Sequence, residues 1–250
     1  MSENNKLVWI VGASSGIGES LVPLYAGAGW RVVVSARNEQ KLQALAQDNE
    51  NIESVPMDVT DGAQVSAALE RFQQRDEVPD LTIYCSGIYF PGGISALTEE
   101  NSVASMDTNY LGAVRVIAGL FPMLKKRRAG HIAIISSLSA YSGLPHAVCY
   151  GPTKAALNNL CESMKPEFDK ADLDLSVINP GYVKTPMTDN NKFDMPFIVS
   201  SEKAAQEIFK GLERRKFEIF FPSFLGVVLK FLRVLPYALY FPVAKMITKQ

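Results

Sequence analysis

The chain has 250 residues, which is enough for one large domain or two small ones. Its 25 basic and 26 acidic side chains give a formal net charge of −1, which argues against nucleic acid as the main partner because phosphate binding needs a basic surface. The apolar fraction of 47% excludes a disordered chain, and three cysteines are too few for a disulfide scaffold.

Short apolar runs alternate with longer segments of helical spacing along the whole chain. Several runs are unbroken stretches of valine, isoleucine and leucine, a pattern typical of strands that are buried on both faces of a parallel sheet. The predicted strands are 7–11, 32–36, 52–57, 81–85, 131–136, 174–179 and 217–221. The predicted helices are 16–28, 38–47, 61–75, 101–126, 151–169 and 202–214. This order predicts an α/β fold, a doubly wound parallel sheet with helices on both faces.

No repeat, low-complexity stretch or Pro/Gly/Ser-rich linker divides the chain. We therefore expect a single domain over residues 1–221, followed by an apolar, basic C-terminal extension over 222–250. The segment 182–200 has few periodic apolar positions and predicts a loop long enough to act as a lid. The polar N-terminus has no signal-peptide pattern, so we expect a cytoplasmic protein with reduced thiols.

A turn with three glycines, Gly12, Gly16 and Gly18, joins the first predicted strand to the first predicted helix. Glycines let the backbone approach a pyrophosphate closely, and a helix N-terminus offers free N–H groups and a partial positive charge to that anion. The spacing is GxxxGxG rather than the GxGxxG of the general dinucleotide fingerprint. Its place between a strand and a helix nevertheless predicts a nucleotide site.

The second predicted strand ends in Ala36-Arg37 and carries no carboxylate at its tip. Folds that bind NAD usually hold the adenosine ribose with an acidic residue near this point. A guanidinium suits the 2′-phosphate of NADP, which an acidic residue would repel. We infer NADP(H) as the cofactor.

Tyr150 and Lys154 open a predicted helix four residues apart, so that both side chains share one face. A nearby cation favours the phenolate and eases proton exchange with a carbonyl oxygen. Ser136-Ser137 closes the strand before this helix, where substrates of open α/β sheets bind. Asn109 lies in the long helix before that strand.

These ordered motifs together resemble the short-chain dehydrogenase/reductase family over about residues 6–222. The resemblance rests on the Gly12–Gly18 turn, Asp58-Val59, Ser86-Gly87, Asn109, Ser137, Tyr150 with Lys154, and Asn179-Pro180-Gly181 with Val183 and Thr185. It implies a seven-stranded parallel sheet in the order 3-2-1-4-5-6-7, and it makes 1–221 a dinucleotide-binding and catalytic domain.

The resemblance also implies a role for each of four catalytic residues. Tyr150 would be the general acid in reduction, or the base in oxidation. Lys154 would bind the nicotinamide ribose and favour the phenolate. Ser137 would hydrogen-bond the substrate oxygen, and Asn109 would hold a water that relays protons to Lys154.

The expected cofactor contacts extend along the carboxyl ends of the strands. They are Gly12, Ser14, Ser15, Gly16, Ile17, Gly18, Arg37, Asp58, Val59, Ser86, Gly87, Tyr150, Lys154, Pro180, Gly181, Val183 and Thr185. No metal site is expected, because the cysteines lack CxxC spacing and there are only two histidines. The chain departs from the family at Val11, where a threonine is usual, and at Tyr84-Cys85-Ser86-Gly87, which lacks the family's two asparagines.

The segment from Phe220 to Ile247 is unusually apolar for a water-soluble enzyme. In a helix, Ser223, Gly226, Lys230 and Arg233 would share one narrow polar face. Three explanations stay open. The segment lies in a membrane interface with its cations toward the headgroups, packs in a homodimer, or folds back over the substrate pocket as an apolar lid.

We therefore expect an NADPH-dependent oxidoreductase that reduces an apolar ketone or aldehyde to an alcohol. One rival is an oxidative NAD-linked dehydrogenase, and another is an NADP(H) sensor without turnover. A third is a membrane-docked structural protein. We expect a homodimer or homotetramer. Its expected location is the cytoplasm, either free or in peripheral contact with the inner membrane surface.

Overall fold

A computed structural model describes residues 6–189, 191 and 193–247, so two positions of the predicted 182–200 loop and both chain ends lie outside the described residues. Its centre is a seven-stranded sheet in the order β3-β2-β1-β4-β5-β6-β9, with every neighbouring pair parallel. The strands are β1 (Leu7–Val11), β2 (Arg31–Ser35), β3 (Ile52–Ser54), β4 (Leu81–Tyr84), β5 (His131–Ile135), β6 (Asp174–Pro180) and β9 (Glu218–Phe221). The predicted fold class and strand order are confirmed, since β9 is the seventh strand of the sheet.

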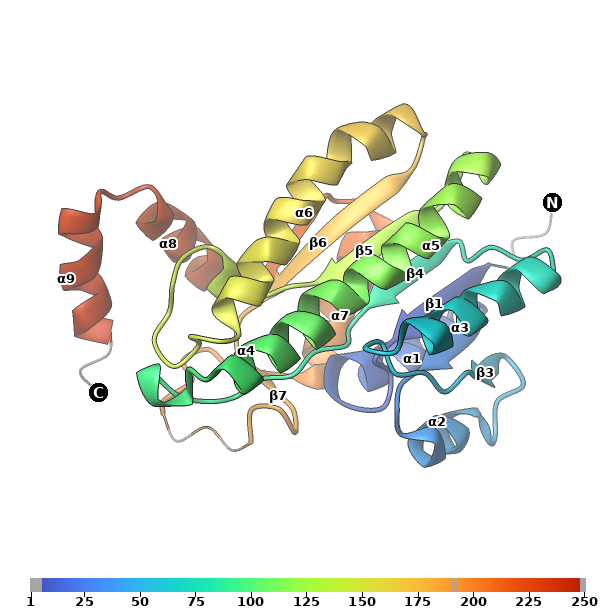
Figure 1. Ribbon diagram of the computed structural model, residues 1–250, viewed down its shortest axis with the longest axis horizontal. Helices are drawn as coiled ribbons and strands as arrows, with labels where there is room; N and C mark the ends of the chain where they lie inside the picture. The colour runs from blue at the N-terminus through green and yellow to red at the C-terminus, as the bar shows by residue number, and fades with distance from the viewer. Residues whose placement is uncertain (1–5, 190, 192, 248–250) are drawn as a thin grey trace.

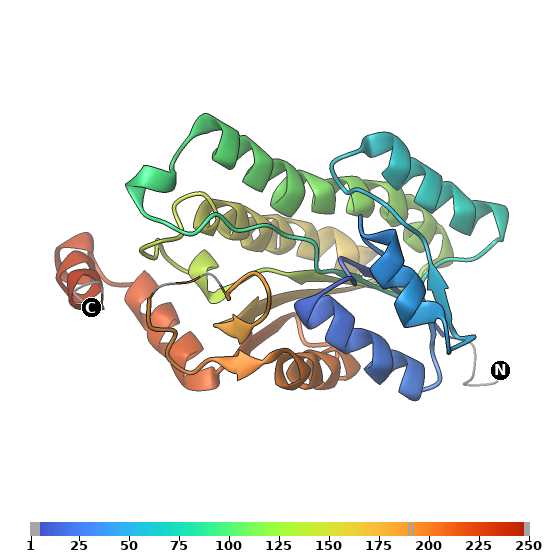
Figure 2. The ribbon, with the colours of Figure 1, turned by 90° about the horizontal axis from the view of Figure 1, so that it is seen from below.

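Helices cover both faces of the sheet, as Figures 1 and 2 show. One face carries α1 (Gly16–Gly27), α2 (Glu39–Ala46) and α7 (Ser201–Glu213), and the other carries α3 (Gly62–Gln74), α5 (Gly112–Arg127) and α6 (Gly151–Lys170). The alternation along β1 explains this double cover. Trp9 joins the apolar core under α3, α5 and α6, whereas Val8 and Ile10 join the core under α1, α2 and α7.

The order of the strands reverses next to β1, because β2 and β3 lie on one side of it and β4 to β6 on the other. In open parallel sheets, ligands bind beyond the carboxyl ends of the strands at this switch point. The loops at the carboxyl ends of the strands are therefore the ones that can form a site, and those after β1 and β4 lie nearest the switch point.

Before the C-terminal segment, the structure differs from the predicted elements in several places, and the predicted strand 52–57 is shortened to Ile52–Ser54. The predicted helix 101–126 is divided into α4 (Glu99–Met106), a π-helical turn at Asp107–Leu111, and α5. The predicted loop 182–200 is bounded by two short strands, β7 (Val183–Lys184) and β8 (Val199–Ser200), which pair with each other outside the main sheet.

The C-terminal segment forms α8 (Ser223–Arg233) and α9 (Tyr237–Ile247), which extend from the end of the body at the left of Figure 1. The expected polar face of α8 does not point outward as one stripe. Gly226 is buried against the Phe220 ring, and Lys230 forms an ion pair with Glu218 of β9. Among the residues that the structure describes, no helix is long and apolar enough to cross a membrane.

Candidate active site

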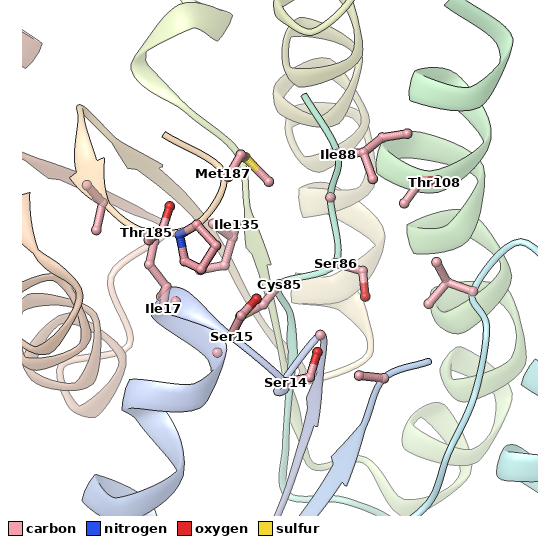
Figure 3. A pocket seen from close by; sticks show the side chains of 18 of the residues that line it. Ser14, Ser15, Ile17, Cys85, Ser86, Ile88, Thr108, Ile135, Thr185 and Met187 are labelled. Atoms are coloured by element: carbon pink, nitrogen blue, oxygen red, sulfur yellow. The ribbon is translucent and has the colours of Figure 1, made fainter. Parts of the chain in front are cut away.

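A cleft of about 500 Å³ opens at the switch point, beyond the carboxyl ends of β1, β4, β5 and β6. Figure 3 looks into it. Ser14 and Ser15 lie on the turn before α1, and Ser86 and Ile88 follow β4. Thr185 and Met187 come from the loop after β7. The cleft is thus assembled from segments that are far apart in the sequence.

The backbone of the glycine turn lines this cleft at positions where a side chain would not fit. Gly12 has a φ of +96°, and a Cβ there would lie 2.5 Å from the Ser86 nitrogen. A Cβ on Gly18 would lie 2.2 Å from the Gly12 oxygen. Ser15 caps α1 without a side-chain hydrogen bond, so the first turn of the helix keeps its N–H groups available to an anion.

Ser137, Tyr150 and Lys154 meet beyond the end of β5. The Ser136 hydroxyl donates to the Lys154 carbonyl oxygen (3.0 Å), which fixes the first turn of α6 to that strand. Lys154 Nζ donates to the Ile135 carbonyl oxygen (2.8 Å) and lies 5.3 Å from the centre of the Tyr150 ring. The Tyr89 ring packs edge-on against Tyr150, with the ring centres 5.4 Å apart.

Burial shifts the pKa values of these two groups in opposite directions. It raises the pKa of the Tyr150 phenol, an effect that hydrogen bonding with Ser137 opposes. It lowers the pKa of the Lys154 ammonium to about 8, partly offset by Cys85. A phenol that keeps its proton beside an ammonium is suited to donating that proton to a substrate oxygen.

Asn109 lies in the π-helical turn, and its side chain is buried behind the cleft rather than exposed in it. Its Oδ1 accepts from the Ile88 N–H (2.7 Å), and its Nδ2 donates to the Ile88 carbonyl (3.0 Å) and to Thr153 Oγ1 (3.0 Å). These bonds hold the segment after β4 against the start of α6. Whether Asn109 also holds a water for proton relay stays a prediction.

Tyr84 provides a brace at the segment where the family's two asparagines are missing. Its hydroxyl donates to the Thr108 carbonyl oxygen (2.6 Å) in the same π-helical turn. Gly112 leaves room for this phenol, because a Cβ there would lie 2.3 Å from the Tyr84 oxygen. The departure from the family pattern is therefore compensated locally, from the strand to the turn that carries Asn109.

Arg37 and Asp58 lie on the side of the cleft formed by the segments after β2 and β3. The Arg37 side chain is exposed, and the part of the chain that the structure describes offers it no ion-pair partner. Asp58 Oδ1 accepts from both the backbone N–H and the hydroxyl of Thr60 (2.9 and 2.8 Å). Among the described residues, this side of the cleft therefore presents the guanidinium of Arg37 without an ion-pair partner.

A second cavity of about 260 Å³ adjoins the first and shares Ser137, Tyr150 and Gly181 with it. Its walls are mainly apolar and aromatic. His146 stacks on Phe193, with ring centres 5.0 Å apart, and Tyr182 packs edge-on against the same Phe193. Among the described residues that line this cavity, none is a lysine or arginine.

Helix α8 closes one side of the second cavity with Leu225 and Leu229. Of the three explanations for the C-terminal segment, folding back over a pocket therefore describes α8. Hydrogen bonds and an ion pair hold α8 and α9 beside the loop that joins Ser137 to Tyr150. Glu218 accepts from the Tyr141 hydroxyl (2.6 Å) as well as pairing with Lys230, and Tyr240 of α9 donates to the Gly143 carbonyl (2.5 Å).

Every predicted cofactor or catalytic residue lines the first cleft, with the exception of Asn109. The residues Ile88, Thr108, Met187 and Thr188 also line it without having been predicted. In the second cavity, Tyr89, Tyr182 and Phe193 were likewise missed. Aromatic residues in loops carry no periodic signal, and only the fold brings these three together.

No group of three or more histidine, cysteine or acidic side chains that could hold a metal ion occurs within residues 6–189, 191 and 193–247. Cys85 lies at the floor of the cleft, where burial raises the pKa of its thiol to about 12. The free cysteines therefore give no indication of a nucleophile at this site.

Comparison with known proteins links this geometry to a family. Residues 6–195 match the family model described as short chain dehydrogenase. A Myxococcus xanthus protein named as an uncharacterized oxidoreductase is 32% identical over 238 residues, covering 92% of this chain and 93% of that protein. The Xenopus laevis protein named dehydrogenase/reductase SDR family member 7B is 27% identical, covering 95% and 80%.

Solved structures share the fold at lower identity. A short chain dehydrogenase from Burkholderia cenocepacia, crystallised in complex with NADP, superposes with a TM-score of 0.84 at 23% identity, covering 97% of this chain and 99% of that one. A variant of actinorhodin polyketide ketoreductase, crystallised with NADPH, gives a TM-score of 0.80 at 20% identity, covering 90% and 98%.

Proposed function

The chain belongs to the short-chain dehydrogenase family, and from that premise we propose that it is an NADPH-dependent oxidoreductase that reduces a ketone or aldehyde carbonyl to an alcohol. The observation that carries the proposal is the convergence of Ser137, Tyr150 and Lys154 where the two cavities meet. A cofactor in the first cleft and a substrate in the second would have their reacting atoms beside these three side chains.

The first cleft fits a dinucleotide of this kind. At Gly12 and Gly18 a side chain would collide with backbone, so the turn leaves that space to a ligand, and the first turn of α1 faces it with its N–H groups. Gly12 to Gly18 would hold the pyrophosphate, Asp58 and Val59 the adenine side, and Lys154 the nicotinamide ribose. Pro180, Gly181, Val183 and Thr185 would flank the nicotinamide.

Arg37 supports NADP(H) over NAD(H). Its guanidinium lines the cleft where the adenosine ribose would lie, and the tip of β2, from Val32 to Arg37, carries no carboxylate to bind an unphosphorylated ribose. The Burkholderia and ketoreductase structures were crystallised with phosphorylated cofactors, which agrees with this assignment.

When bound, the cofactor supplies a hydride to the carbonyl carbon. Tyr150 donates its proton to the carbonyl oxygen as negative charge develops there, and the buried phenol holds this proton at neutral pH. The Ser137 hydroxyl hydrogen-bonds the same oxygen and orients it. The Lys154 ammonium stabilises the phenolate that Tyr150 leaves behind.

The second cavity supports an apolar, uncharged substrate. Leucine and aromatic side chains form much of its surface, and the lining residues that the structure describes include neither lysine nor arginine to pair with a phosphate or carboxylate. An anionic group would lose its hydration there without gaining a cationic partner from the described lining, which includes the carboxylate of Asp194.

Titration of the purified protein with NADPH, followed by addition of aldehydes, ketones and fatty 3-oxo compounds, tests this function. We expect tight NADPH binding, oxidation by an apolar carbonyl, and a loss of kcat of roughly a hundredfold or more in Tyr150→Phe. Tyr89→Phe is the matched control, because it keeps the ring that packs on Tyr150 and removes only a hydroxyl bonded to the His146 carbonyl. NADPH binding without turnover of any compound would favour the sensor, and failure to bind NADPH would refute the proposal.

The proposed assembly is a homodimer or homotetramer located in the cytoplasm. Val103 of α4 and Leu111 of the π-helical turn are exposed apolar side chains on the helical layer, which supports contact with another copy. Size-exclusion chromatography with light scattering measures the mass of the assembly. A monomer at micromolar concentration would contradict the proposed assembly.

A further inference from the structure

Helix α8 packs on the body through Gly226, Leu229 and Leu232, which are buried, and its half-exposed Lys230 also turns toward β9. Lys230 reaches back to Glu218 and lies over the Phe220 ring, 4.2 Å from its centre. Gly226 allows this close packing, since a Cβ there would lie 2.2 Å from a Phe220 ring carbon. The inner face is thus fixed to β9.

The outer face of α8 carries large apolar side chains in one continuous stripe. Phe224, Val227, Phe231 and Val234 follow each other at helical spacing and are 68%, 58%, 63% and 74% exposed. Phe197, from the loop before β8, extends the stripe by packing edge-on against Phe224 at 5.9 Å. In α9, Tyr237 and Phe241 stack on each other and are both exposed.

The charge of this segment favours one occupant for that face. From residue 219 to 250 the sequence contains four basic residues and no acidic one, and with Glu218, which pairs with Lys230, the segment 218–250 still has a net charge of +3. A second copy docked face to face would bring these like charges together, whereas an anionic lipid surface would attract them. Each helix has 11 residues and spans only about 16 Å, too short to cross the roughly 30 Å core of a bilayer but suited to lying in its interface.

We infer that the outer face of α8, with Phe197 and α9, docks the protein onto the surface of an anionic bilayer. Phe224 and Phe231 enter the boundary between headgroups and acyl chains, and Arg233 at the end of α8 stays at headgroup level. The inner face of the same helix lines the second cavity with Leu225 and Leu229. Docking therefore brings that cavity within about one helix diameter, roughly 10 Å, of the lipid.

Co-sedimentation with extruded vesicles tests the inference on the full chain. The vesicles are phosphatidylcholine alone or an equimolar mixture with phosphatidylglycerol. We expect the wild-type protein to bind the mixed vesicles, and to bind less as salt rises. The double variant Phe224→Gln/Phe231→Gln should bind the mixed vesicles at least roughly tenfold more weakly, because two exposed rings no longer enter the lipid.

A double variant at two other exposed apolar positions, Ile94→Gln/Leu97→Gln, is the matched control and should bind vesicles as the wild type does. Unchanged NADPH binding in all three proteins shows that the fold is kept. Wild-type protein that stays in the supernatant with both vesicle types, or equal binding by all three proteins, overturns the inference. So does a wild-type dimer that Phe224→Gln/Phe231→Gln dissociates in the absence of vesicle binding. These readouts involve no turnover, so their failure is distinct from a failure of the proposed reductase activity.

Discussion

Arg37 is the residue on which the preference for a phosphorylated cofactor depends. Its guanidinium is exposed at the cleft and has no ion-pair partner among the described residues, so it can bind a 2′-phosphate at little cost in broken contacts. A charge-assisted hydrogen bond of this kind contributes about 1.5–3 kcal/mol.

Arg37→Ala is therefore expected to lower kcat/KM with NADPH by roughly 10–100-fold and to leave kcat/KM with NADH nearly unchanged. Steady-state kinetics with both cofactors measure the two values. Lys41→Ala is the control, because this lysine is exposed on α2 and does not line the cleft. Equal use of both cofactors by the wild-type protein would refute the role of Arg37.

Lys154 gives the site a predictable dependence on pH. Burial lowers the pKa of its ammonium to about 8, so the free protein loses this charge as pH rises through that value. The same burial raises the pKa of Tyr150, so the phenol keeps its proton over the same range. As pH rises, Lys154 is thus the first of the two groups to lose its proton, and with it the charge that would bind the cofactor ribose.

We expect kcat/KM for NADPH to be constant below pH 8 and to fall about tenfold per pH unit above it. Kinetics between neutral pH and pH 10, at a fixed high carbonyl concentration, measure this limb. Lys154→Arg should remove the limb, whatever its absolute activity, because a guanidinium stays charged throughout. A wild-type profile that is flat to pH 10 would contradict the assignment.

At the scale of elements, the packing of α1 against the glycine turn requires a glycine at position 18 but not at position 27. A Cβ on Gly18 would lie 2.2 Å from the Gly12 oxygen, whereas a Cβ on Gly27, at the other end of the same helix, meets no atom within 4 Å. Gly18→Ala must therefore push the glycine turn away from α1. Gly27→Ala only reduces the conformational freedom of the unfolded chain.

Gly18→Ala should lower the free energy of unfolding by about 2 kcal/mol or more and weaken NADPH binding at least roughly tenfold. Gly27→Ala should raise the free energy of unfolding by up to about 1 kcal/mol and leave binding unchanged. Urea unfolding and NADPH titration measure both effects. Wild-type affinity in Gly18→Ala would show that the close approach of turn and helix is not needed for the site.

The sequence predicted the elements whose pattern depends on burial on two sides. The central strands β1, β4 and β5 were recognisable because they are buried at every position, and the first cleft followed from the motifs at the strand ends. The π-helical turn at Asp107–Leu111 was not recognisable from the sequence, because one inserted residue barely changes a helical period. The pair β7 and β8 was missed because two-residue strands have no pattern.

Helix α8 shows a further limit of sequence patterns. Its spacing identified a polar and an apolar face, but which face packs on the body depends on Glu218, a partner twelve residues away on a strand. The second cavity was unpredictable for the same reason, because its aromatic walls come from Tyr89, Tyr182 and Phe193 in separate loops. Contacts of this kind exist only after the chain has folded.

At the scale of the whole molecule, the two cavities draw on different parts of the chain. Every residue that lines the first cleft lies before position 189, whereas the second cavity needs Leu225 and Leu229 of α8. The division into a domain over 1–221 and an extension over 222–250 therefore predicts that cofactor binding and turnover can be separated. Cofactor affinity would belong to the domain, and turnover would require the extension.

A chain that ends at Phe221 tests this division. It keeps all seven strands and the hydrogen bond between Tyr141 and Glu218, but it uncovers Leu138 and Tyr141, which α8 buries. We expect a lower melting temperature, NADPH affinity within about threefold of the full chain, and turnover of an apolar carbonyl reduced at least roughly tenfold. A chain that ends at Pro236 is the control, because it keeps α8 and should retain turnover within about threefold. If the shorter chain fails to fold, residues 222–250 belong to the domain, because the cover that α8 gives to Leu138 and Tyr141 is then part of its core.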